Sequence, residues 1–129
     1  MASVETVLIA ALKANATIAA MTAGRISVWG GLQDPAYPYV TIQRISTPTA
    51  EHLNGPATLQ WPRIQFDIWA TKATEAMDVA EAIRTAIDNV AVAGNPGFTA
   101  TFQDQRGPAP DSETRSFGVS QDYFLYHER

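Results

Sequence analysis

The clearest alternation of hydrophobic and polar positions in the chain is the segment RIQFDIWA at residues 63–70. Its two isoleucines and its phenylalanine fall on one side of an extended backbone, and polar side chains fall on the other. That period of two is typical of a half-buried β-strand. Pro62 precedes the run, where its missing N–H removes no central ladder bond. We therefore predict a strand here, and we expect the rest of the fold to be built around it.

Two segments have the hydrophobic spacing of amphipathic helices. The first begins at Ser3, a candidate N-cap, and runs to about Asn15, with a continuation to Met21 left open. The second follows the strand directly, and the hydroxyl of Thr71 or Thr74 can accept from a free N–H of its first turn. Its apolar stripe comprises Ala76, Val79, Ala80, Ile83, Ala86, Ile87 and Val90. Both stripes predict packing against a sheet.

Four further segments have the composition of strands: residues 25–29, 39–47, 98–102 and 116–127. In the second of them Ile45 breaks the alternation, so either a bulge falls near Arg44 or both faces are partly covered at that end. The resulting order is α-β-β-β-α-β-β. It predicts a single α+β domain over residues 1–129, a two-layer sandwich with a mostly antiparallel sheet of about five strands and both helices on one face.

The predicted core combines the strand at residues 63–70 with side chains from both helices. It comprises Leu8, Ile64, Phe66, Ile68, Ile83 and Ile87. In the last predicted strand the apolar residues share one parity, and Gln121 is the exception.

Two polar, proline-containing segments join the strands as long hairpin connections, at Thr47–Gln60 and Gln103–Arg115. Each is long for a connection inside a compact domain and too polar to add to the core. Two interpretations are open: a mobile loop, or a loop that contacts a partner. The candidate partner contacts are Glu51, His52, Leu53 and Asn54 in the first segment, and Gln105, Arg106, Asp111 and Glu113 in the second.

Composition narrows the classes of function. Hydrophobic residues make up 46 % and charged residues only 17 %, which indicates a soluble globular protein with much of its surface facing other protein. The net charge of -4 argues against a nucleic-acid binder that neutralises phosphates. The absence of cysteine excludes disulfides, thiolate zinc sites and cysteine nucleophiles. The first residues lack a basic region, so neither a secretory signal nor a membrane span is expected.

Catalytic chemistry is not expected. His52 and His127 have no histidine or carboxylate companions at metal-ligand spacing, so we expect both to lie on the solvated surface. Asp67 and Asp122 could converge as a carboxylate pair, but alternating polar residues on an exposed sheet face explain them more simply. The sequence contains no P-loop, GxGxxG or GxSxG motif. We therefore predict no catalytic, cofactor-binding or metal-binding residues, and no enzymatic activity.

Four segments together resemble a known family. They are PYVTIQ at residues 38–43, RIQFDIWA at 63–70, AEAIRTAID at 80–88 and DYFLYH at 122–127. In order and spacing, over nearly the whole chain, they are similar to the phage tail-completion family. That family includes the tail-terminator and head-to-tail joining proteins of long-tailed phages and of phage-derived particles such as gene transfer agents.

The resemblance implies a structural virion protein made in the bacterial cytoplasm. Such a protein forms a six-fold ring that caps the finished tail tube and docks it to the neck. Its implied partners are copies of itself, the tail tube protein and a neck or head-completion protein, with DNA passing through the channel unbound. It carries no catalytic residue and contacts no membrane. The alternatives are another ring of the neck and a small stand-alone binding module.

Overall fold

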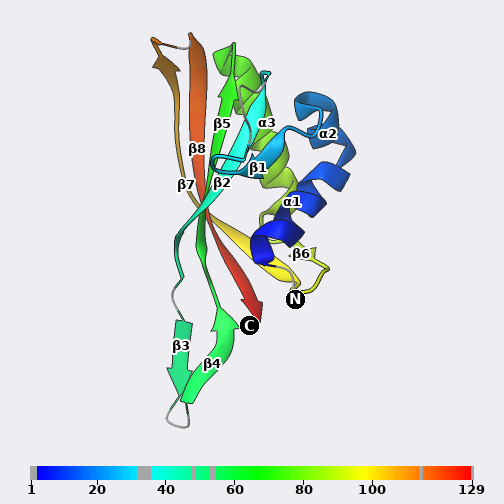
Figure 1. The fold of residues 1–129 in the computed structure, drawn as a ribbon, viewed down its shortest axis with the longest axis vertical. Helices are drawn as coiled ribbons and strands as arrows, with labels where there is room; N and C mark the ends of the chain where they lie inside the picture. The colour runs from blue at the N-terminus through cyan, green and yellow to red at the C-terminus, as the bar shows by residue number, and fades with distance from the viewer. Residues whose placement is uncertain (1–2, 32–35, 48, 53–54, 114, 129) are drawn as a thin grey trace.

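The computed structural model describes residues 3–31, 36–47, 49–52, 55–113 and 115–128, and its ribbon is elongated (Figure 1). The helices are α1 (Val4–Ala14), α2 (Ala16–Thr22) and α3 (Ala73–Ile87). The strands are β1 (Ile26–Val28), β2 (Tyr39–Ser46), β3 (Thr49–His52), β4 (Gly55–Gln60), β5 (Arg63–Ala70), β6 (Ala91–Val92), β7 (Phe98–Asp111) and β8 (Ser116–Glu128).

The strands form one curled, mixed sheet in the order β1-β2-β5-β8-β4-β3, and β7 pairs with both β8 and β6. The prediction of an α+β fold with helices beside a mostly antiparallel sheet is confirmed in part. The sheet is larger than the five strands predicted, and β1 runs parallel to β2. The two-layer description is incomplete, because the β3–β4 hairpin extends beyond the layer of helices (Figure 1).

β5 is a central strand, as its sequence predicts. It lies between β2 and β8, pairing in antiparallel register with β2 from Arg63 to Trp69 and with β8 along its whole length. Its burial alternates at every residue from Arg63 to Ala70, so one face is fully enclosed. The register with β2 shifts between Arg44 and Ser46. Of the two explanations for the broken phase at Ile45, the bulge is therefore correct, and Ile45 is exposed.

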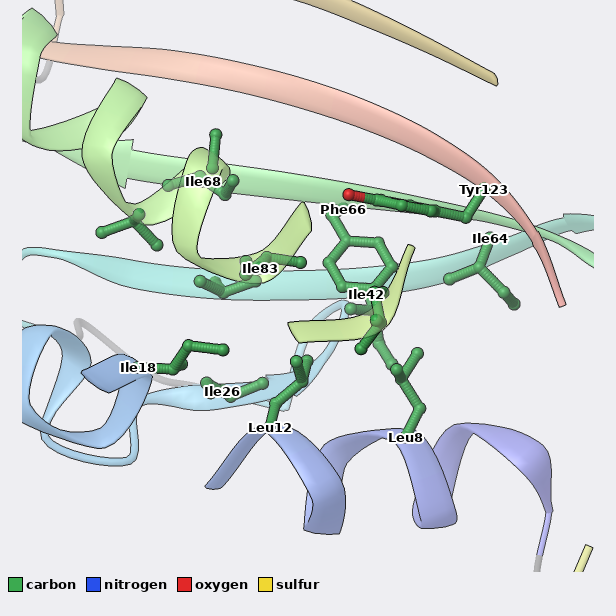
Figure 2. Close-up of a cluster of buried hydrophobic side chains, with 14 of the residues drawn as sticks. Leu8, Leu12, Ile18, Ile26, Ile42, Ile64, Phe66, Ile68, Ile83 and Tyr123 are labelled. Atoms are coloured by element: carbon green, nitrogen blue, oxygen red, sulfur yellow. The ribbon is translucent and has the colours of Figure 1, made fainter. Parts of the chain in front are cut away.

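The core lies between this face of the sheet and the helices. All six predicted core residues are buried, and the largest buried side chains also include Tyr123, Leu12 and Ile18. Figure 2 shows Leu8 and Leu12 reaching from α1 toward the sheet, where Ile42 and Phe66 lie. The rings of Phe66 and Tyr123 are 5.2 Å apart between centroids, within the range of aromatic packing. Side chains on the opposite face of β5 are only half-buried.

The helices differ from the prediction at their ends. The first breaks at Asn15, whose side chain accepts from the backbone N–H of Ile18 and caps a separate α2. The N-cap of α3 is Lys72, with no side-chain capping bond, so the capping predicted for Thr71 or Thr74 is wrong. Because α3 ends at Ile87, Val90 lies outside its stripe and is exposed.

No single helix in the described part of the chain is long and apolar enough to cross a membrane. α1 and α2 meet the length and composition criterion only as a pair, with a bend of 88° between them.

Candidate functional site: two hairpins and the open face of the sheet

The β3–β4 hairpin extends two strands of the sheet beyond the helices. β4 continues into β5 through Trp61 and Pro62, and both strands pair with β8 in the same register. The connection itself also bonds to β8, since the N–H of Leu125 donates to the carbonyl of Pro62 at 3.0 Å. On β8, the described part of β4 pairs only through Leu59 and Gln60. The rest of the hairpin is therefore held by pairing between β3 and β4. It projects from one end of the long axis (Figure 1).

The segment Thr47–Gln60, predicted to be a long hairpin connection, is mostly this hairpin. Glu51 and His52 end β3, close to its tip. Leu53 and Asn54 lie outside the described residues. Within the described part, Glu51 pairs with Pro56 and His52 with Gly55 through the backbone.

The segment Gln103–Arg115 was predicted to be a polar connection outside the strands. It is instead mostly strand. β7 continues through it to Asp111 and pairs with β8, with register shifts between Phe102 and Asp104 and between Arg106 and Ala109. Prolines, charges and bulges are features that sheets place on edge strands, where they discourage pairing with other chains. The same features had indicated a loop in the sequence.

The β7–β8 hairpin turns at the opposite end of the long axis from β3–β4 (Figure 1). Asp111 fixes this turn, because its carboxylate accepts from the N–H of Glu113 at 3.0 Å and its carbonyl accepts from the N–H of Arg115 at 2.9 Å. Arg115 adopts a φ of 57°, in the left-handed region. Glu113 is exposed at the tip. Two of the predicted contact residues, Asp111 and Glu113, therefore lie at this end.

Gln105 and Arg106, the other two predicted contacts in β7, bind β8 within the subunit. Gln121 is fully buried, and its amide donates to the carbonyl of Ala80 and to Oε1 of Gln105, each at 3.0 Å. The out-of-phase glutamine in the sequence therefore connects β8 to α3 and to β7. Such a buried amide is tolerated because it is hydrogen-bonded.

Asp122 is the charged centre of the sheet face turned away from the helices, which we call the open face. The Asp122 residue is only 2 % exposed. Arg106 donates to both of its oxygens at 3.1 Å, and Arg63 Nη2 donates to Oδ2 at 2.6 Å. Arg106 also pairs with Asp104 at 2.8 Å. A fork of two parallel bonds is the strongest arrangement for an arginine and a carboxylate, so this network ties β7, β8 and β5 together.

Burial alone would raise the pKa of Asp122. The hydrogen bonds from Arg106 and then from Arg63 outweigh that effect, and they hold the pKa of the carboxyl below its ordinary value. The same pairing raises the pKa of Arg106, first through Asp122 and then through Asp104. The network therefore stays ionised at neutral pH.

Asp67 and Asp122 do not form the carboxylate pair considered from the sequence. Asp67 instead accepts from the Ser120 hydroxyl at 2.7 Å and from the Gln65 amide at 3.0 Å. The preferred interpretation, an exposed polar position, is wrong for Asp122, which is buried and bound by two arginines. Asp67 is half-buried. A matched pair of carboxylates for acid–base chemistry is not assembled at these positions.

A hollow of about 530 Å³ lies on the open face, between the sheet and the far part of β7. Its lining includes Asp67, Trp69, Arg106 and Glu113. Gly118 makes room for the indole of Trp69, because a Cβ at that position would lie 2.8 Å from the ring. The open face is therefore hollowed at this point, and polar and aromatic side chains line the hollow.

The histidines are separated in the fold. His52 lies in β3 and His127 in β8, where His127 is only 8 % exposed, so the predicted solvated position of His127 is wrong. Over the described ranges, no three histidine, cysteine or acidic residues are grouped where they could hold a metal ion.

Asp122→Asn is expected to lower the free energy of unfolding at pH 7 by about 1–3 kcal/mol, because two arginines lose their buried anion. The native pKa is depressed, so the carboxylate's contribution is complete above the unfolded value of about 3.9 and is lost as the pH falls through the native value. The stability gap between the two proteins should therefore narrow below about pH 4. Urea unfolding across this range measures it, and a gap independent of pH would contradict the assignment.

The chain was then compared with known proteins. Its fold is similar to that of a chain in the "Virion of native gene transfer agent (GTA) particle", with a TM-score of 0.78 and 14 % sequence identity. The alignment covers 98 % of this chain and 96 % of that one. No curated protein matches the sequence. The model of the family described as "Tail completion protein gp17" matches residues 6–128. The chain therefore belongs to the tail completion protein family, and it is a structural component of the tail of a phage or phage-like particle.

Proposed function

We propose that this protein forms a ring of six copies that caps the finished tail tube and joins the tail to the neck. The observation that carries the proposal is the position of the two hairpins, which lie at opposite ends of the long axis (Figure 1). A subunit that links two assemblies needs one contact surface for each of them. Loops held by a rigid scaffold commonly supply such contacts.

The two hairpin ends differ in construction, which suits two different partners. The β3–β4 hairpin is held mainly by its own strand pairing. We assign the candidate contacts Glu51, His52, Leu53 and Asn54 to one partner. Glu113 lies at the other tip and is assigned to the second partner. Labelling one hairpin tip in the assembled particle would show which tip meets the tail tube and which meets the neck.

The other three candidate contacts have a supporting part in this proposal. Gln105 and Arg106 hold β7 on β8, and Asp111 fixes the turn that presents Glu113. Gln105 and Arg106 remain exposed beside these bonds, and Asp111 is half-buried. We therefore include them as partner contacts whose polar groups are already oriented within the subunit.

The net charge of -4 suits a channel through which DNA passes. A surface of the same sign as the phosphates does not retain them, because tight phosphate binding needs clustered lysine and arginine. The most strongly hydrogen-bonded arginine of the open face, Arg106, is neutralised by Asp122 and Asp104.

Deletion of the gene from its phage or phage-like element tests the proposal. We expect filled heads and separate tails, some of abnormal length, in place of complete particles, and we expect the unaltered gene to restore joining when supplied in trans. Electron microscopy of the lysate gives the result. Complete, normal particles without this protein would refute a role in capping or joining.

A further inference from the structure

We propose that adjacent copies in the ring pack front to back, with the aromatic pair Trp61 and Tyr126 on the open face of one copy seated in the groove between α2 and α3 of the next. This inference rests on the proposed ring and specifies its subunit interface. The occupant of the groove is therefore a second copy of the same chain.

The aromatic pair is a preformed knob. Trp61 lies in the connection between β4 and β5, Tyr126 lies on β8, and their rings are stacked with centroids 6.5 Å apart. The ring centroid of Phe124, also on β8, lies 6.5 Å from that of Tyr126. Tyr126 is 39 % exposed despite its size. Rigid aromatic side chains lose little entropy on contact, and tryptophan, tyrosine and arginine are the residues that most often dominate interfaces.

The groove lies on the other layer of the molecule, between α2 and α3, and has a volume of about 410 Å³. Met21, Ala82 and Ala86 form the half-buried apolar part of its lining, and the half-buried polar residue there is Asn15. Asp78 and Glu81, which also line it, are exposed. Small side chains let a ring approach the helix backbone closely, and methionine packs well against aromatic rings. The groove is thus apolar at depth and acidic at its exposed side.

The two surfaces are complementary in charge. Arg63 stands across from Phe124 on the open face, and its guanidinium donates a single described bond, to Asp122. A guanidinium has five N–H donors, and this side chain is 40 % exposed. Within the part of the chain that the structure describes, Asp78 and Glu81 form no ion pair. Arg63 and the Tyr126 hydroxyl can therefore supply donors to the two carboxylates.

The position of the two surfaces favours a second copy over any other occupant. They belong to opposite layers, sheet and helices, while the hairpin ends that we assign to the tube and neck lie at the ends of the long axis (Figure 1). Unlike surfaces on opposite sides of one subunit make a heterologous contact, and such contacts produce closed rings when the rotation between subunits allows it. The sheet would then be covered by helices on both faces.

Cysteine cross-linking in assembled particles tests the interface, because the natural chain contains no cysteine. The double variant Tyr126→Cys with Ala82→Cys, treated with a short bis-maleimide, should give a ladder of covalent oligomers on a denaturing gel. Trp61→Cys with Thr85→Cys repeats the test at a second position of the same contact. Either single variant should stay monomeric, since a front-to-back contact never places two copies of one residue together.

The matched control is Tyr126→Cys with Lys13→Cys, which keeps the knob cysteine and moves the second to an exposed position near the end of α1. It should give no ladder. Joined particles that yield monomers from both test pairs would overturn the interface and leave the joining function standing. Dimers from the single Tyr126→Cys variant would also overturn it, since they require a symmetric contact. Failure of the joining function would appear separately, as normal particles without the gene.

Discussion

Phe66→Ala is expected to lower the free energy of unfolding by about 3–5 kcal/mol, the usual cost of emptying a buried aromatic site. Phe66 is fully buried in the middle of β5 and packs beside Tyr123, whose own ring lies 5.6 Å from Phe102 of β7. Removing the ring would leave a cavity between the sheet and the helices, which close packing cannot fill without moving several elements. Urea unfolding monitored by circular dichroism measures the loss.

Met77→Ala is the matched control for this substitution. Met77 is also a large apolar residue, but it is 47 % exposed on α3. Its removal should change stability by no more than about 0.5 kcal/mol. Equal effects from the two substitutions would show that the strand has been assigned the wrong buried face.

Shortening the β3–β4 hairpin is expected to abolish joining of heads to tails while leaving the subunit folded. Replacing residues 50–59 by Asn-Gly closes the hairpin on the pair Thr49 and Gln60, which face each other in the sheet. The β5 contacts and the core are unchanged, and loop length alters closure entropy by only about 0.6 kcal/mol per doubling. The count of joined particles after complementation, with circular dichroism of the purified variant, gives the two readouts.

Met77→Ala keeps the hairpin at full length and changes an exposed residue of α3 outside both hairpins, so it serves as the control. It should support joining at the level of the unsubstituted protein. Normal joining with the shortened hairpin would show that β3–β4 is not a docking element. At the other end, a shortening confined to residues 112–115 would keep the network at Asp122, whereas deleting the whole of Gln103–Arg115 would also take Arg106 from that buried carboxylate.

The parts of the fold that the sequence predicts are those where local pattern and tertiary packing agree. The alternation in β5 identified the buried face, since isoleucine and phenylalanine at every second position are all buried when that one face of the strand packs against the core. The stripe of α3 did the same for the helix, except that Val90 continued the pattern beyond the turn at Ile87. The phase break at Ile45 correctly indicated a bulge as one of two explanations.

The parts that the sequence did not predict depend on long-range pairing. Pro108 and Pro110 favour a loop when only the sequence is considered. An edge strand accommodates prolines, because it has a neighbouring strand on one side only and uses only alternate N–H groups for pairing. The burial of Asp122 follows from arginines 59 and 16 residues away, which no local pattern reveals. The break between α1 and α2 did leave a signal, since Asn15 before an apolar run is a helix-start residue.

The most direct test of the account is a cryo-EM reconstruction of the particle with this subunit labelled by a small tag at its amino terminus. We predict one ring of six labelled copies at the head-proximal end of the tail tube, with the two hairpin ends of each subunit directed toward the tube and the neck. Labelled density along the tube, at the distal tip or in the capsid would contradict the proposed function.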